Sequence, residues 1–415
     1  MKPPVEFNDV LAGGAGADRY ARQRLIPGWR QERIAAARAL VAGAGALGNE
    51  VIKNLALLGV GEICIVDFDR VEASNLARCV LFRAGDVGHG KAQAAARAAM
   101  ELNPDVTARA LDGDIGRDVG EGELRGYDLV FGCVDSIAAR WALNRLCRRA
   151  GVAWWNGGMS AQVGQVSCFA PQQGACYECT MTRSMWQRMH ARRSCLLAGK
   201  PVANAQPQAA SVLTASVTAA LLVQQAVAAL LCEGNPEAQA LPPGTLLSLD
   251  TVQNQMQRLP LRQNPQCAAH AADAEWSAPE ILLAAAPDAL TVADVLRAVS
   301  GAIAWLPRAE IVTGLECAAC GAEPRLLLLH HLRREDLPCS RCGALRLPRL
   351  SAPVTMGDAL ARERLHRLGV PHQAILDVQT RQGVRQVELT VPRPGRKGQA
   401  SAAVDARVQA GAGAR

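Results

Sequence analysis

Residues that could bind a nucleotide are spaced along the first third of the chain. Gly43, Gly45 and Gly48 form a Gly-x-Gly-x-x-Gly motif between an apolar run at 39–42 and a helical pattern at 51–58. The first glycine permits a tight turn, the second lets backbone approach a phosphate, and the third allows close helix–sheet packing. Asp67 ends the next apolar run, where its carboxylate could accept from a ribose hydroxyl. Taken alone, this pattern predicts a NAD dehydrogenase.

Polar residues that follow Asp67 indicate a different chemistry. They are Asp69, Asn75, Arg78, Lys91 and Asp135. Hydride transfer needs a flat apolar slot, whereas cationic groups suit a polyphosphate whose negative charge grows during transfer. Asp135 follows an apolar run at 127–133 that predicts a parallel strand. Ligands bind at that edge of such sheets, and a carboxylate there can hold Mg²⁺.

Two sets of residues have the spacing of zinc ligands. A Cys-x-x-Cys unit at 176–179 is paired with the Cys-x-x-His unit at 267–270, giving three thiolates and one imidazole in a closed, structural site. A second set has two Cys-x-x-Cys units separated by 18 residues, as in a zinc ribbon. Free buried thiols are the alternative for each. The expected ligands are Cys176, Cys179, Cys267 and His270 in the first set, and Cys317, Cys320, Cys339 and Cys342 in the second.

One further cysteine is a candidate nucleophile. Cys195 follows Arg192 and Arg193 and lies close to His190. Neighbouring cations lower the pKa of a thiol and raise its thiolate fraction. The alternative is a non-essential loop thiol, and the sequence does not decide between the two.

Composition excludes several classes of protein. In 415 residues, 45 Lys and Arg against 38 Asp and Glu give a net charge of +7, without the runs of like charge that bind nucleic acid. The most apolar segment, 209–231, contains Ser, Thr and Gln and predicts a buried helix rather than a membrane span. The first residues lack a secretory pattern, and cysteines paired in zinc-like units indicate a reducing, cytoplasmic compartment.

Strand-like and helical segments alternate through the first 250 residues. The run at 39–42, the glycine motif, the helix at 51–58 and the strand at 62–67 form one βαβ unit. A helix at 90–102, strands at 106–110 and 127–133, a helix at 138–150, strands at 152–155 and 165–169, a long helix at 207–231 and a strand at 246–250 follow. This order predicts an α/β fold with a Rossmann-like, doubly wound mixed sheet.

In their order along residues 18–270, these motifs resemble the ThiF/MoeB family, the adenylating core shared with ubiquitin-activating enzymes. The resemblance rests on Arg-Tyr-x-Arg-Gln at 19–23, the glycine motif, Asp-x-Asp…Ser-Asn-Leu-x-Arg at 67–78, Gly-x-x-Lys at 88–91, Asp135 and Cys-x-x-Cys. One position departs from the family pattern, which has Gln where this chain has Cys79. The family's second zinc unit also usually ends in Cys rather than in a residue like His270.

The resemblance implies a role for each matching residue. Arg22 would be an arginine finger that reaches the ATP site of a partner subunit, so a homodimer is expected. Asp67 would bind ribose, Asp135 would bind Mg²⁺, and Asp69 matches an acidic position of the family. The triphosphate would be held by Asn75, Arg78 and Lys91. In related enzymes a crossover loop carries the cysteine that accepts the acyl group, and here that residue would be Cys195.

Six segments are expected. They are an N-terminal arm at 1–31, a ThiF/MoeB-type adenylation domain with a zinc site at 32–272, a helical linker at 273–312, a zinc ribbon at 313–350, a small α/β piece at 351–392 containing a helix at 358–368, and a disordered tail at 393–415. The ribbon lies outside the family core. It is expected to stabilise the protein or to dock a carrier or a conjugating protein.

The resulting hypothesis is an ATP-dependent activating enzyme with ATP, Mg²⁺ and zinc as cofactors. The C-terminal Gly of a ubiquitin-like or sulfur-carrier protein would be adenylated, with Cys195 then accepting the acyl group as a thioester. One alternative is adenylation of a small carboxylate or a tRNA base by the same fold. Another is a catalytically silent zinc-binding scaffold. No nucleic-acid or membrane partner is expected.

Overall fold

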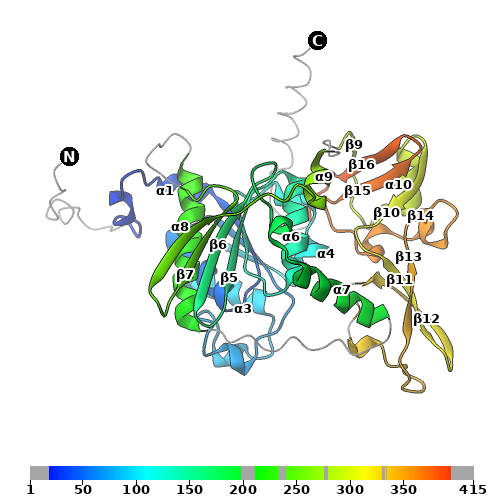
Figure 1. The fold of residues 1–415 in the computed structure, drawn as a ribbon, viewed down its shortest axis with the longest axis horizontal. Coiled ribbons are helices and arrows are strands. Elements are labelled where there is room, and N and C mark those ends of the chain that lie inside the picture. The colour runs from blue at the N-terminus through cyan, green and yellow to red at the C-terminus, as the bar shows by residue number, and fades with distance from the viewer. Residues whose placement is uncertain are drawn as a thin grey trace, which may run out of the picture.

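The computed structural model describes residues 18–197, 211–232, 240–274, 279–329, 332 and 334–393. Within these residues the chain forms an eight-stranded, a five-stranded and a three-stranded sheet (Figure 1). Most of the predicted arm, the predicted tail from residue 394, and residues 207–210 of the predicted long helix lie outside the described residues.

The eight-stranded sheet has the predicted mixed, Rossmann-like organisation. Its order is β3-β2-β1-β4-β5-β6-β7-β8. Strands β3 to β5 pair in parallel, and β6 to β8 continue the sheet in antiparallel pairs. The strands are β1 Arg38–Ala42, β2 Glu62–Val66, β3 Thr107–Leu111, β4 Leu129–Gly132, β5 Trp154–Met159, β6 Val163–Phe169, β7 Thr245–Asp250 and β8 Gln255–Pro260.

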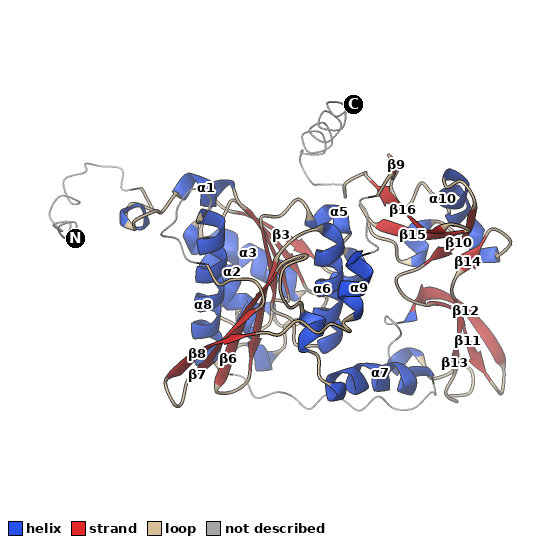
Figure 2. Ribbon diagram, turned by 45° about the horizontal axis from the view of Figure 1, so that its top comes forward, coloured by secondary structure: helices blue, strands red, loops and turns tan. Residues whose placement is uncertain are grey.

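Helices cover both faces of this sheet (Figure 2). On one face, α2 (Ala46–Leu58), α3 (Lys91–Leu102) and α8 (Val212–Leu231) share a core with β1 and β2. On the other face, α6 (Ile137–Ala150) packs with the short helices α4 (Ile115–Asp118) and α5 (Glu121–Leu124). The short helix α1, Gln31–Ala36, precedes β1. Both α2 and α6 end at a glycine in the left-handed conformation, which closes a helix without strain.

Helix α8 is the one described helix that is long and apolar enough to cross a membrane by length and composition. It packs against α2 and against strands β5 and β6, and Ala215, Ala219 and Leu222 are fully buried there. The apolar character of α8 is thus used in the core of this domain.

Two elements of this domain differ from the prediction. The segment around Cys195, expected to be a crossover loop, is the helix α7 (Arg183–Leu197). Helix α7 leads from the first Cys-x-x-Cys unit to the three-stranded sheet, where it lies beside β13 (Figures 1 and 2). Strand β8 was not predicted, because all six of its residues are exposed and no apolar alternation marks it.

The C-terminal residues form a second sheet that joins two segments which the sequence analysis separated. Its order is β14-β10-β15-β16-β9, so strands from 273–312 pair with strands from 351–392. The expected helical linker therefore contains strands as well as one helix. These elements are β9 Ile281–Leu283, α10 Val292–Ala298, β10 Ala302–Leu306, β14 Val354–Thr355, β15 Ile375–Thr380 and β16 Gly383–Leu389.

The helix expected at 358–368 is also wrong. Two 3-10 turns occupy Ala359–Arg362 and Leu365–Leu368, with Glu363 and Arg364 extended between them. The backbone of Glu363 accepts a hydrogen bond from Val292 N (3.3 Å), and Arg364 bridges to Thr291. These contacts with the start of α10 use backbone groups that a continuous helix would use internally.

The three-stranded sheet is inserted between β10 and β14. Its strands, in the order β12-β11-β13, are β11 Ile311–Cys317, β12 Gly321–Leu328 and β13 Leu347–Ser351. The tight connection from β11 to β12 contains Cys317 and Cys320, and the loop before β13 contains Cys339 and Cys342. The sheet therefore brings the two Cys-x-x-Cys units together.

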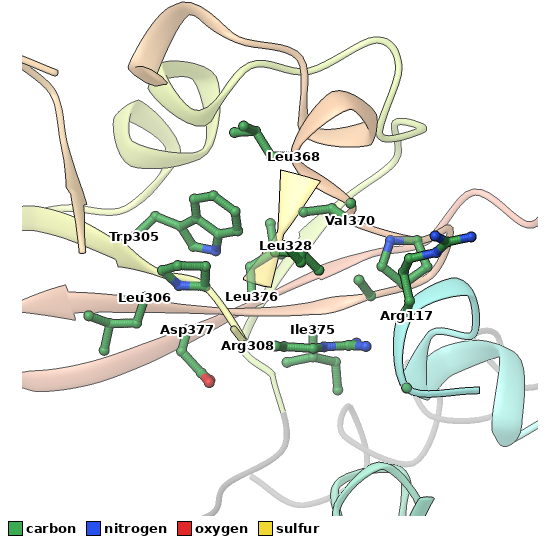
Figure 3. Close-up of a pocket in the computed structure, with 15 residues that line it drawn as sticks. Arg117, Trp305, Leu306, Arg308, Leu328, Leu368, Val370, Ile375, Leu376 and Asp377 are labelled. Carbon is green, nitrogen blue, oxygen red and sulfur yellow. The ribbon is translucent and has the colours of Figure 1, made fainter. Parts of the chain in front are cut away.

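A buried charge cluster joins the C-terminal sheet to the first domain. Glu121, which is fully buried, forms ion pairs with Arg149 (3.3 Å) and Arg308, and accepts from Ile375 N (3.0 Å). Arg149 also pairs with Asp377 at 2.7 Å. Figure 3 shows a pocket beside this cluster, lined by apolar side chains of the C-terminal unit and by Arg117 of α4. Such buried pairs fix the relative placement of the two units.

Candidate functional site

The glycine motif forms the turn from β1 into α2. Gly43 has φ +96°, and a Cβ there would lie 2.6 Å from the carbonyl oxygen of Cys133. A Cβ on Gly48 would lie 1.9 Å from the carbonyl oxygen of Gly43. Beside Gly45 the space is open. The first and third glycines therefore permit internal packing, and the second leaves a backbone surface that a phosphate can approach, as predicted from the motif.

Asp67 holds this turn in place. Its Oδ2 accepts from Ala44 N at 2.7 Å, and its Oδ1 accepts from Asp69 N at 2.8 Å. Burial raises the pKa of Asp67 above its usual value, although both hydrogen bonds act in the opposite direction. Each carboxylate oxygen can accept a second hydrogen bond. The carboxylate therefore fixes the glycine turn and keeps acceptor capacity for a ligand.

Lys91 is oriented by Asp69. Its Nζ donates to Asp69 Oδ2 at 2.8 Å, and its backbone N donates to Asp69 O at 2.8 Å. The Lys91 side chain is 13% exposed. Burial opposes its charge, but the hydrogen bond and the charge of Asp69 outweigh burial and raise the pKa of Lys91. A permanently charged ammonium thus lies at the start of α3.

Asn75 and Arg78 lie on the segment that follows β2. Asn75 is buried, and its Oδ1 accepts from Glu72 N at 3.0 Å, while Arg78 is half-buried. Asn49 joins this segment to the glycine turn, because its Nδ2 donates to Ala44 O (2.6 Å) and its Oδ1 accepts from Leu81 N (3.0 Å). Sequence reasoning missed Asn49, a fully buried amide one residue after the motif.

Asp135 lies directly after β4, next to the glycine turn. Cys133 N donates to Ala42 O at 2.8 Å, so the loops after β4 and β1 run side by side. Asp135 is exposed, and Ser136 caps α6 by accepting from Ala139 N at 2.9 Å. An exposed carboxylate at the carboxyl edge of parallel strands fits a hydrated Mg²⁺, which keeps several waters and takes one or two carboxylates.

Arg22 is the predicted site residue that lies away from this edge. It is exposed, and the arm around it is anchored through Tyr20. The Tyr20 hydroxyl accepts from Asn103 Nδ2 at 2.8 Å, and its ring lies over Gly59. Gly59 and Asn103 follow α2 and α3, so they lie at the sheet edge opposite the glycine turn. Arg22 does not meet the other residues within one chain.

The first predicted zinc set converges on one point. The ligand atoms of Cys176, Cys179, Cys267 and His270 all lie within 4.8 Å of one another. Cys176 Sγ lies 3.8 Å from Cys179 Sγ and 3.7 Å from Cys267 Sγ. With Zn–S bonds of about 2.3 Å, a tetrahedral site has S–S edges of about 3.8 Å. His270 Nε2 is buried and has no hydrogen-bond partner among the described residues, as an open ligand atom requires.

Helix α6 holds this cluster from behind. Asn144 Oδ1 accepts from Tyr177 N (3.1 Å), and Arg145 binds Glu178 through two hydrogen bonds of 2.8 and 3.1 Å. Arg148 Nη2 contacts His270 Nδ1 at 3.2 Å. Burial and the Arg148 charge lower the pKa of His270, which favours the neutral imidazole that binds metals.

The second predicted set also converges. Cys317, Cys320, Cys339 and Cys342 lie within 4.8 Å of one another, with Sγ–Sγ distances of 3.6, 3.2 and 3.8 Å. Gly321 and Gly343 follow the two pairs with φ +90° and +71°, the left-handed turns predicted for them. Four thiolates fill a tetrahedral shell, so this arrangement fits a structural zinc ion.

Cys195 lies on α7, beyond the first zinc cluster along the chain. The structure describes its backbone as helical and places α7 against α6 and β13. The predicted proximity of its thiol to the nucleotide edge stays a prediction, since its side chain is outside the described part of the chain.

The glycine turn, Lys91 and Asp135 on adjoining parallel strands, with two tetrahedral cysteine clusters, define a nucleotide-binding α/β protein with structural zinc sites. Residues 18–269 match the model of the ThiF family, and the chain belongs to this family. The resemblance stated from the sequence is thereby confirmed.

Several curated relatives support this assignment. The sulfur carrier protein adenylyltransferase of Thermus thermophilus is 34% identical over 258 residues, 60% of this chain and 89% of that protein. The SAMP-activating enzyme E1 of Haloferax volcanii is 32% identical over 258 residues, 60% of this chain and 87% of that protein. Mouse adenylyltransferase and sulfurtransferase MOCS3 is 39% identical over 168 residues, 40% of this chain; the chain spans only 36% of its length.

A solved structure also aligns with the first domain. The crystal structure of E. coli MccB with ATP has a TM-score of 0.49 and 21% identity, covering 61% of this chain and 74% of that chain. The family and the names of the curated relatives confirm the predicted enzyme class, an adenylyltransferase or activating enzyme.

Proposed function

We propose that this chain uses ATP to adenylate the C-terminal carboxylate of a ubiquitin-like or sulfur-carrier protein. The observation that carries the proposal is the row of groups along three adjoining strands. Asp67 follows β2, the glycine turn follows β1, and Asp135 follows β4. Lys91 is positioned beside Asp67 through Asp69. The adenylyltransferases and activating enzymes among its relatives support the same conclusion.

In the proposed reaction the substrate carboxylate attacks the α-phosphorus of ATP. A carboxylate O–P bond forms, the bond to the β-phosphate breaks, and pyrophosphate leaves. Asp67 would accept from the ribose, while Asn75, Arg78 and Lys91 would hold the phosphate chain and stabilise its developing charge. Asp135 would hold Mg²⁺, which shields the phosphates. These residues act by positioning and charge, because no protein nucleophile is needed for this step.

The exposed arm is proposed to act between subunits. Arg22 lies at the edge opposite its own nucleotide site, so it would reach a phosphate only in a second copy of the chain. A homodimer in which each arm completes the partner's site accounts for this placement. The thiol-rich metal clusters suit a reducing cytoplasmic setting, where both sets of ligands stay available for zinc.

Cys195 is proposed to act after adenylation. Its thiolate would attack the acyl carbon of the adenylate, forming a thioester while the acyl–oxygen bond breaks and AMP leaves; the thiol proton passes to solvent. The thioester would then be available to an acceptor such as a conjugating protein. Docking of that protein on the ribbon is part of the proposal, because α7 lies beside β13.

ATP–pyrophosphate exchange tests the proposal. The full chain is assayed with three small ubiquitin-fold sulfur-carrier proteins that end in Gly-Gly, each intact and without its terminal Gly. The proposal expects exchange with at least one intact carrier and none with its shortened form. Exchange that continues in Cys195→Ala, together with loss of a thiol-reducible enzyme–carrier adduct, would assign the second step to Cys195. Exchange supported by acetate or by tRNA, but by none of the carriers, would contradict the proposal.

A further inference from the structure

Two polar atoms lie unpartnered and buried next to the nucleotide edge. They are Nε of Arg140, in the second turn of α6, and Oδ1 of Asn156, on β5; neither has a hydrogen-bond partner among the described residues. A buried polar group without a partner costs roughly 1–3 kcal/mol, so it often marks a place where a ligand binds. One of these atoms is a donor and the other an acceptor.

Both atoms lie between α6 and β5. Arg140 Nη2 donates to the carbonyl of Gly157 at 3.2 Å, which holds the guanidinium against the strand. Asn156 and Gly158 share one face of β5, because side chains alternate along a strand. A Cβ on Gly158 would lie 3.9 Å from Arg140 Nη2, so this face is the one that looks toward α6. No atom would come closer than 3.7 Å to that Cβ, which leaves room beside the strand.

The position of this pair in the sheet suggests its ligand. Groups proposed for the nucleotide follow β2, β1 and β4, and β5 is the next strand in the order. Asp135 lies only five residues before Arg140 on the same loop and helix. A substrate whose carboxylate reaches the α-phosphate from the side opposite the ribose must therefore pass along β5.

We propose that Arg140 and Asn156 bind one peptide group in the extended C-terminal tail of a protein substrate. Arg140 Nε–H donates to the carbonyl of that peptide group, and Asn156 Oδ1 accepts from its N–H. The open space beside Gly158 accommodates a tail of glycines. This inference rests on the proposed adenylation. It names the substrate class, since a donor and an acceptor together match an amide, whereas a small carboxylate offers no N–H.

The test is a mutant cycle in the exchange assay with the active carrier. One carrier is intact, and the other has an ester in place of its last peptide bond, which removes the N–H. We expect the ester to raise the carrier KM of the wild type about tenfold, as loss of one hydrogen bond implies. Asn156→Leu should raise the KM for the intact carrier by a similar factor and should not distinguish it from the ester. Asn156→Asp keeps the acceptor oxygen and should restore the distinction.

Arg140→Lys keeps the charge but lacks the Nε–H, so it should raise the carrier KM and leave the ATP KM unchanged. Arg297→Lys, at an exposed position on α10, is the matched control and should leave both values unchanged. Equal sensitivity of wild type and Asn156→Leu to the ester would overturn this inference while leaving the proposed function intact. Absence of exchange by the wild type with every intact carrier would instead contradict the proposed function, and this inference with it.

Discussion

Arg145 on α6 grips Glu178, the residue between Cys176 and Cys179, through two hydrogen bonds of 2.8 and 3.1 Å. The same helix begins beside Asp135 and ends near Arg149, which pairs with Asp377 of the C-terminal sheet. One helix therefore connects the nucleotide edge, the first zinc cluster and the C-terminal unit. A change at any of these three places is transmitted to a shared rigid element.

Removing the Arg145 side chain should destabilise the zinc knuckle. Glu178 is 3% exposed and would be left without its ion-pair partner, whereas Arg145 is 39% exposed and partly screened by water. We expect Arg145→Ala to lower the free energy of unfolding by about 1–3 kcal/mol. Urea unfolding at neutral pH measures this. Arg145→Lys, which keeps the charge without the two-pronged geometry, should fall between the two. Unchanged stability in Arg145→Ala would show that the pair is not needed.

Zinc analysis should find two ions per chain. Cys267→Ser removes one thiolate from the first cluster, and Cys342→Ser removes one from the ribbon, so each variant should lose one ion. Structural zinc binding is coupled to folding, and the Cys342→Ser ribbon should become sensitive to protease. Metal content by mass spectrometry, with Cys232→Ser as a control outside both clusters, measures the stoichiometry. Two ions retained in Cys342→Ser would contradict the tetrathiolate site.

Loss of the Lys91 charge should slow adenylation more than it weakens ATP binding. Its ammonium is held by Asp69 beside the glycine turn and is proposed to stabilise charge that develops during transfer. We expect Lys91→Met to reduce the maximal exchange rate by about 10²–10³. Asp69→Asn keeps the ammonium but loosens it, so a smaller reduction is expected. A Lys91→Met enzyme with an unchanged rate would remove this residue from the mechanism.

The C-terminal unit should show a measurable acid dependence at α10. Hydrogen bonds from the Thr291 side chain and backbone lower the pKa of Asp294 below its usual value. A lowered carboxyl pKa gives stability that is present above the unfolded value of 3.8 and is lost as pH falls through the folded value. Asp294→Ala should therefore cost about 0.5–2 kcal/mol at pH 7. The difference from wild type should shrink below about pH 4. A pH-independent difference would argue against this cap.

Much of the first domain was predictable because its signals are local. Strands β1, β2 and β4 are buried apolar runs, and the glycine motif falls between two of them. The zinc ligands were predictable from spacing within each pair. The pairing of 176–179 with 267–270, across about 90 residues, also rested on the family resemblance rather than on spacing alone.

Elements defined by long-range contacts were not predictable. Strand β9 has three residues and forms only by pairing with β16, more than 100 residues later. Residues 358–368 carry a helical pattern, yet Glu363 and Arg364 bond to the start of α10 instead. Asn49 and Asn156 carry no motif of their own, and their roles appear only when the turn, the strand and α6 are seen together.

The most direct test of the central claim is mass spectrometry of the carrier after incubation with the enzyme, ATP and Mg²⁺. The proposed function predicts a carrier that gains one adenylyl group at its C-terminal carboxylate, before any thiol transfer. The adduct should be absent with Asp135→Ala and with a carrier that lacks its terminal Gly. ATP bound or hydrolysed with no adenylated carrier, under conditions in which the carrier binds, would contradict the claim.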